Sequence, residues 1–117
     1  MIGLGRQTRV YLALGATDMR KSIDGLSILV SDYLDHDPFS GHVFAFCNRR
    51  RNLVKVLYWD RNGFCLWCKR LEQDRFVWPV EKDEVKQVDM RRFSWLLDGL
   101  SMEQKQAHKQ REFSLVF

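Results

Sequence analysis

The residues best suited to chemistry are the basic side chains between positions 49 and 75. This segment carries eight basic and three acidic residues, a net charge of +5, whereas the whole chain of 117 residues has a net charge of +4. Arginine and lysine bind phosphate oxygens, so a basic segment of this kind is typical of proteins that contact nucleic acid. The candidate nucleic-acid-binding residues are Arg49, Arg50, Arg51, Lys55, Arg61, Lys69, Arg70 and Arg75. The alternative is a solvated turn surface with ordinary salt bridges such as Arg70–Glu72.

Two shorter patterns could indicate metal chemistry. Cys65 and Cys68 have the spacing of half a zinc site, but residues three apart on a strand point to opposite faces, and no second cysteine pair exists. We therefore interpret both as buried or half-buried thiols and expect neither a metal nor a cofactor. Glu84-Val85-Lys86 has the Glu-x-Lys spacing of some metal-dependent nucleases, with Asp60 or Asp74 as the upstream acid. Because such short patterns arise often by chance, the nuclease is a remote alternative and we expect no enzyme.

The elements that must position these residues begin with a strand and a helix. Val10 to Leu14 is a short apolar run that predicts a buried strand, which Gly15 ends. A helix is expected next, with Thr17 or Asp18 as its N-cap. It should end at the residue before Pro38. Apolar residues at helical spacing form one stripe, namely Met19, Ile23, Leu26, Val30 and Leu34.

After position 41 the pattern becomes that of strands. The predicted strands are His42–Cys47, Leu53–Trp59, Phe64–Leu71 and Arg75–Trp78, with Asn62-Gly63 as a hairpin signal. Residues 81–90 fit neither period, 91–100 predict a helix, and Ser101 is the expected cap of another, from Met102 to about Glu112. The expected class is α+β: an antiparallel four- to five-stranded meander with an N-terminal amphipathic helix on one face, plus C-terminal helices.

Aromatic residues occupy both faces of the predicted meander, and one helix can cover only one face. Either the C-terminal helices cover the second face, or that face is left for a partner. The candidate partner-binding aromatics are Tyr58, Trp59 and Trp67.

Length and composition predict one domain, residues 1–117. The chain has no apolar run of about 18 residues and no signal-peptide pattern, so we expect no membrane span. Three cysteines without a secretory context indicate a reduced, cytoplasmic protein.

The region from about Val10 to Leu100 resembles a family of small accessory proteins, TnpB (second reading frame), of the insertion-sequence-sixty-six group of bacterial elements. Residues 101–117 lie beyond this likeness as a C-terminal tail that we expect to be helical. The resemblance rests on combined order and spacing, and Cys47, Cys65 and Cys68 depart from it. The matching stretches are Asp18-Met19-Arg20-Lys21-Ser22, Asp37-Pro38-Phe39-Ser40-Gly41, Phe44-Ala45-Phe46, Asn48-Arg49-Arg50-Arg51, Lys55-Val56-Leu57-Tyr58-Trp59-Asp60, Asn62-Gly63-Phe64, Leu66-Trp67, Lys69-Arg70-Leu71-Glu72 and Phe76-Val77-Trp78-Pro79.

The resemblance implies an accessory protein for DNA transposition, encoded beside a transposase that performs the strand chemistry. It does not extend to the much longer RNA-guided nucleases of the same name. Two hypotheses follow: the chain binds DNA through its basic hairpins, or it docks on the transposase of the same element. The sequence leaves the oligomeric state open.

Overall fold

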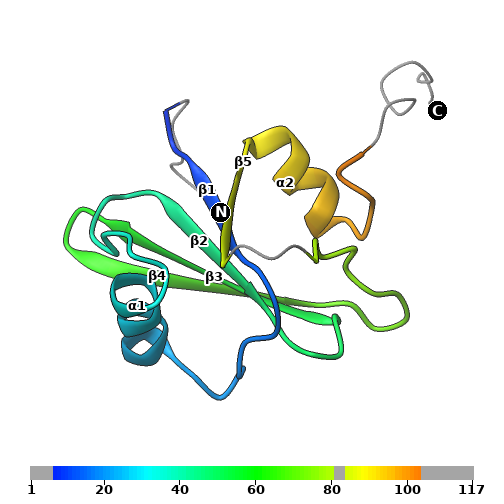
Figure 1. Cartoon of the computed structure of the whole chain (residues 1–117), viewed down its shortest axis with the longest axis horizontal. Coiled ribbons are helices and arrows are strands. Elements are labelled where there is room, and N and C mark those ends of the chain that lie inside the picture. Colours follow the sequence, from blue (N-terminus) through cyan, green and yellow to red (C-terminus); the bar gives the residue numbers. More distant parts are fainter. Residues whose placement is uncertain (1–6, 81–83, 104–117) are drawn as a thin grey trace.

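The computed structural model describes residues 7–80 and 84–103 of the chain. They form a five-stranded mixed sheet with one helix on each face, in the order β1 (Val10–Ala13), α1 (Ile23–Asp32), β2 (Val43–Cys47), β3 (Leu53–Asp60), β4 (Gly63–Arg70), β5 (Val85–Val88) and α2 (Met90–Leu97) (Figure 1). The spatial order of the strands is β4-β3-β2-β1-β5. The α+β class is confirmed. Neither helix in this described part of the chain is long and apolar enough to cross a bilayer.

The meander is confirmed for three strands and wrong for the sheet as a whole. β2, β3 and β4 are antiparallel neighbours, whereas β1 pairs with β2 in parallel, with Val10 opposite Val43. A parallel pair needs a crossover connection, which α1 provides. β5 joins the other edge of β1 in antiparallel orientation, with Val10 opposite Val88.

The predicted fourth strand, Arg75–Trp78, is wrong. Its alternation is real, since Phe76 and Trp78 are buried and Val77 is half exposed. The segment lies across one face of the sheet, however, and does not pair at an edge. The Phe76 amide donates to the Arg51 carbonyl at 2.7 Å, and the buried Trp78 Nε1 donates to the Ala13 carbonyl at 3.0 Å.

Both sheet faces carry a packed core. The face toward α1 combines Leu26 and Val30 of the helix with Phe44, Phe46 and Leu57 of the strands. The opposite face holds alternate strand residues under α2 and the 71–80 segment; its members include Val43, Ala45, Val54, Val56, Phe76, Trp78, Phe93 and Leu96. β2 is central and buried along its whole length, which explains why Val-Phe-Ala-Phe-Cys shows no polar alternation.

The boundaries of α1 differ from the prediction at both ends. Asp18 closes a turn before the helix, and the N-cap is Ser22, whose side chain makes no capping bond to the residues described. The helix ends at Asp32, five residues before the predicted Asp37-Pro38 boundary, because Asp35 adopts a left-handed conformation with φ 55°. All members of the predicted apolar stripe pack in the core on this face, although Met19 precedes the helix and Leu34 follows it.

The second helix starts and ends slightly earlier than predicted. The Asp89 carboxylate accepts a hydrogen bond from the Arg92 amide at 2.8 Å and so caps α2 at Met90. Leu97 is the last helical residue, and Gly99, with φ 81°, turns the chain away. The expected helix from Met102 to about Glu112 and the apolar end of the chain fall almost entirely outside the described residues.

Candidate nucleic-acid interface

The β2–β3 turn, residues 48–52, projects Arg49 and Arg50 into solvent at one end of the sheet. Asn48 builds this turn, because its Oδ1 accepts the amides of Asn52 and Leu53 at 3.0 and 3.1 Å. Its Nδ2 donates to Asn52 Oδ1 at 2.7 Å. Asparagine suits this position because its side chain can replace backbone partners in a tight turn. The arginines at the tip are therefore held on a rigid support.

Arg75 joins the same end from the loop that follows β4. Its Nη1 donates to the Arg50 carbonyl at 2.6 Å, and the Leu71 amide donates to the Asn52 carbonyl at 2.8 Å. The β2–β3 turn and the loop after β4 therefore share one end of the sheet. Arg61 lies in the β3–β4 turn at the other end, next to the Asp60–Gly63 pair.

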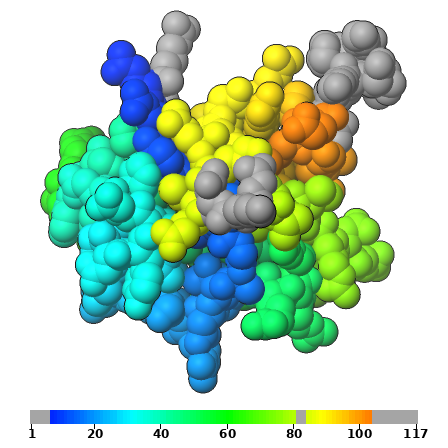
Figure 2. All heavy atoms as spheres, in the orientation of Figure 1, coloured from blue at the N-terminus to red at the C-terminus, as the bar shows by residue number. Residues whose placement is uncertain are grey.

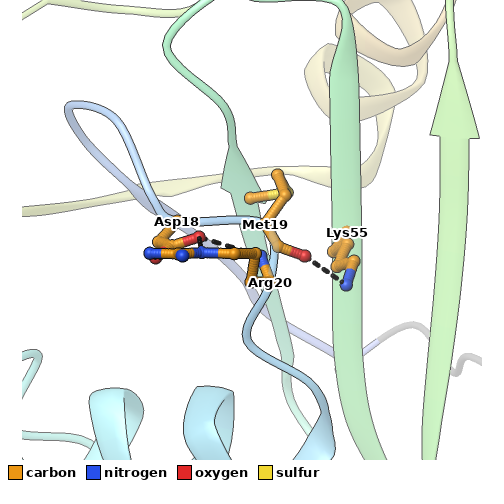
Figure 3. A network of polar contacts seen from close by, with 4 residues as sticks. All are labelled: Asp18, Met19, Arg20 and Lys55. Atoms are coloured by element: carbon orange, nitrogen blue, oxygen red, sulfur yellow. Dashed lines mark hydrogen bonds and ion pairs between the residues drawn. The ribbon is translucent and has the colours of Figure 1, made fainter.

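Three further candidate basic residues, like Arg75, donate side-chain hydrogen bonds to backbone carbonyls within the fold. Lys55 Nζ donates to the Met19 carbonyl at 2.8 Å (Figure 3). It also donates to the Lys21 carbonyl at 2.9 Å. Lys69 Nζ donates to the Leu97 carbonyl at the end of α2 at 2.7 Å, and Arg51 Nη1 donates to the Trp78 carbonyl at 3.1 Å. All three residues are half-buried. These contacts tie loops and α2 to the sheet.

Arg70 is an intermediate case. Its Nε lies 2.9 Å from Glu72 Oε2, and both side chains are largely exposed, so this is the surface ion pair that the sequence suggested. In the described part of the chain, no carboxylate oxygen lies within 4.0 Å of the guanidinium groups of Arg49, Arg50, Arg61 or Arg75.

The sequence prediction missed the loop before α1 as a neighbour of this end. The Thr17 amide donates to the Cys47 carbonyl at 2.8 Å, which brings Arg20 to the end of β2. Arg20 and Asp18 form a bidentate pair whose shortest contact, Arg20 Nη2 to Asp18 Oδ2, is 2.7 Å. The hydrogen bonds from the Arg20 side chain and backbone amide lower the pKa of Asp18 to about 2. No local sequence signal predicts this placement, because the contacting residue lies thirty positions away.

The candidate aromatic residues divide between core and surface. Tyr58 and Trp67 pack against the core under α2. Trp59 forms a three-ring cluster with Phe39 and Phe64, with centroid separations of 5.0 to 5.2 Å. Phe39 is 57% exposed, so this cluster presents an apolar surface near the β3–β4 turn.

The geometry supports neither the Cys65–Cys68 pattern nor the Glu84-Val85-Lys86 pattern as a metal site. Cys65 is opposite Tyr58 and Cys68 is opposite Lys55, so the two thiols point to opposite faces of β4, as the strand prediction required. Cys68 is exposed, where a buried or half-buried thiol was expected. Glu84 and Asp60 lie at opposite ends of the sheet, and the described residues contain no group of three or more acidic, histidine or cysteine side chains placed to hold a metal ion.

The fold and this site define a small α+β protein with a basic sheet end. The IS66 Orf2-like protein family matches residues 8–107, so the chain belongs to that family, which suggests an accessory role in transposition. Two uncharacterised proteins of Sinorhizobium fredii, y4hO and y4jC, are 37% and 36% identical to it over 100 residues. The aligned region covers 86% of this chain in both cases, and 87% and 86% of the relatives. No solved structure is detectably similar.

Proposed function

We propose that this accessory protein contacts the DNA backbone through Arg49, Arg50 and Arg75. The observation that carries the proposal is that two loops bring these arginines to one end of the sheet, with no carboxylate of the described residues neutralising them. Exposed arginines on a rigid turn suit phosphate oxygens, which accept two parallel bonds from one guanidinium group. Such contacts give affinity without reading base sequence.

The test is the salt dependence of duplex binding, measured by fluorescence anisotropy with DNA from the ends of the element. Each phosphate contact contributes about 0.9 to the slope of log K against log salt concentration. Arg49→Gln with Arg50→Gln should lower affinity for all sequences alike and reduce the slope by about 2.

The matched control is Arg49→Lys with Arg50→Lys, which keeps both charges and loses the planar fork. The salt slope of this variant should stay near that of the unmodified protein. A slope near zero for the unmodified protein, or equal affinities for the glutamine variant and the unmodified protein, would contradict the proposal.

A second candidate function, docking on the transposase, is favoured by the Phe39–Trp59–Phe64 cluster. Exposed aromatic rings held by neighbouring rings are typical anchors of protein interfaces. Phe39→Ala should abolish co-purification with the transposase from nuclease-treated extract. Tyr33→Ala removes a more exposed ring, 69% accessible, at the end of α1 and serves as the control. Equal recovery of the transposase with Phe39→Ala and Tyr33→Ala would exclude this cluster.

A further inference from the structure

A second basic site lies at the opposite end of the sheet, where an open cleft of about 1200 Å³ separates the segment before β1 from the β5–α2 turn. In Figure 2 these two segments rise side by side at the upper edge of the molecule. Gln7, Arg9, His42, Gln87 and Arg92 are among its lining residues. We propose that this cleft binds a phosphodiester group of a second DNA segment.

Backbone hydrogen bonds hold both arginines at the cleft, and their side chains make no hydrogen bond or ion pair with any residue of 7–80 or 84–103. The Arg9 amide donates to His42 Nδ1 at 3.0 Å, and the Arg92 amide donates to the capping carboxylate of Asp89 at 2.8 Å. The first of these bonds requires an unprotonated Nδ1, so the proton of the neutral ring resides on Nε2. His42 is thereby a hydrogen-bond donor at the cleft, and the Tyr11 ring, 6.1 Å away between centroids, packs edge-on against it.

The charge of the cleft favours an oxyanion. Arg9 and Arg92 are exposed, and neither guanidinium has a carboxylate within 4.0 Å in the described part of the chain. Asp89 is the acidic residue that lines the cleft, and its Oδ1 already accepts the Arg92 amide. Two guanidinium groups, an imidazole and two glutamine amides can therefore act as donors around one ligand, which suits the several acceptor oxygens of a phosphodiester.

The sheet topology places the two basic sites at opposite ends. Arg9 precedes β1 and Arg49 follows β2, and these strands run in parallel. From His42 to Asn48 the chain advances six residues, which is about 20 Å in a strand. A duplex bound at Arg49 and Arg50 thus leaves the cleft free for another. The choice of DNA as the source of the phosphodiester rests on the proposed function.

Two duplexes carrying a donor and an acceptor dye provide the test, because energy transfer between them requires one assembly to hold both. The unmodified protein should produce transfer. Arg9→Gln with Arg92→Gln should abolish it and still bind a single duplex through the β2–β3 turn. Both substitutions keep the backbone hydrogen bonds described above, so thermal unfolding should be unchanged. Arg91→Gln is the control, since Arg91 lies over the Trp95 ring, 5.5 Å from its centroid, and does not line the cleft.

A second measurement separates this inference from the proposed function. Inorganic pyrophosphate, titrated into the unmodified protein, should shift the side-chain NMR signals of His42 and Arg92. Arg9→Gln with Arg92→Gln should remove the shift of His42. If single duplexes bind but neither transfer nor the shift is seen, the cleft assignment is overturned and the function stands. If the shift occurs and no duplex binds, the proposed function fails, and the cleft is a site for a free phosphate compound. Transfer that survives Arg9→Gln with Arg92→Gln overturns the two-site arrangement.

Discussion

Lys55 Nζ donates a hydrogen bond of 2.8 Å to the Met19 carbonyl, across 36 positions of the chain. Figure 3 shows this bond from the middle of β3 to the loop that leads into α1. A second bond, of 2.9 Å, joins the same ammonium group to the Lys21 carbonyl. The loop carries Arg20, whose side chain is 91% exposed, and Asp18, whose side chain is 43% exposed. Lys55, which the sequence places among the phosphate-binding candidates, therefore holds this loop in place.

Replacement of Lys55 by methionine should destabilise the protein by about 1.5–3 kcal/mol, the usual contribution of hydrogen bonds to a charged group. Urea unfolding measures the loss. Lys21→Met is the control, because Lys21 takes part in the contact through its backbone carbonyl and not through its side chain. It should change stability by less than about 0.5 kcal/mol. Equal stability of the Lys55→Met variant and the unmodified protein would show that water replaces the ammonium group without cost.

Trp78→Phe tests the segment that covers the face under α2. The substitution keeps an aromatic ring at this buried position and removes the Nε1 bond to the Ala13 carbonyl. The expected loss of unfolding free energy is about 1–3 kcal/mol, the cost of leaving a buried carbonyl without its partner. Val77→Ala, half exposed on the other side of the same segment, should have an effect below about 0.5 kcal/mol. If both variants unfold at the same denaturant concentration, the segment does not depend on this bond.

Arg61→Gly should stabilise the β3–β4 hairpin. Arg61 has φ 53°, a left-handed conformation that costs a residue with a side chain about 1 kcal/mol relative to glycine. Arg61→Ala removes the same charge and keeps the backbone strain, so the difference in melting temperature between the two variants isolates the backbone effect. A glycine variant no more stable than the alanine variant would contradict the prediction.

The Cys47 thiol should be unreactive in the native protein. Burial raises its pKa to about 11 from the ordinary value of 9.0. At pH 8 a thiol reagent should label the exposed Cys68 first and Cys47 only after unfolding, as followed by mass spectrometry of peptides. Rapid native labelling of Cys47 would show that β2 opens.

The same group makes stability depend on pH. Because folding favours the protonated thiol, its contribution is complete below pH 9 and falls as pH rises from 9 toward 11. The stability difference between the unmodified protein and Cys47→Ala should therefore shrink between pH 8 and pH 10.5 in urea unfolding. A constant difference across this range would place the thiolate in water in the native state.

Much of the local structure follows from the sequence. The stripe of Leu26, Val30 and Leu34 is buried as its helical spacing predicts, and the hairpin of β3 and β4 lies where the Asn62-Gly63 signal indicates. In the turn itself, the left-handed residue is Arg61, which precedes Asn62-Gly63. The signal therefore locates the hairpin correctly but places the left-handed conformation one residue too late. These features depend on residues close together in the chain, whose pattern is visible in the order of side chains.

The sequence by itself thus determined the class, the family likeness and the segments that bury their apolar sides. Only the tertiary structure decided that β1 pairs with β2 in parallel, that β5 joins its other edge, and which basic residues have no carboxylate partner among residues 7–80 and 84–103. The physical reason is that Lys55, Lys69 and Arg51 donate to backbone carbonyls, which every residue carries, so that no side-chain pattern marks the acceptor. The pairing of the strands determines whether an arginine side chain is solvated or donates to the carbonyl of a distant residue.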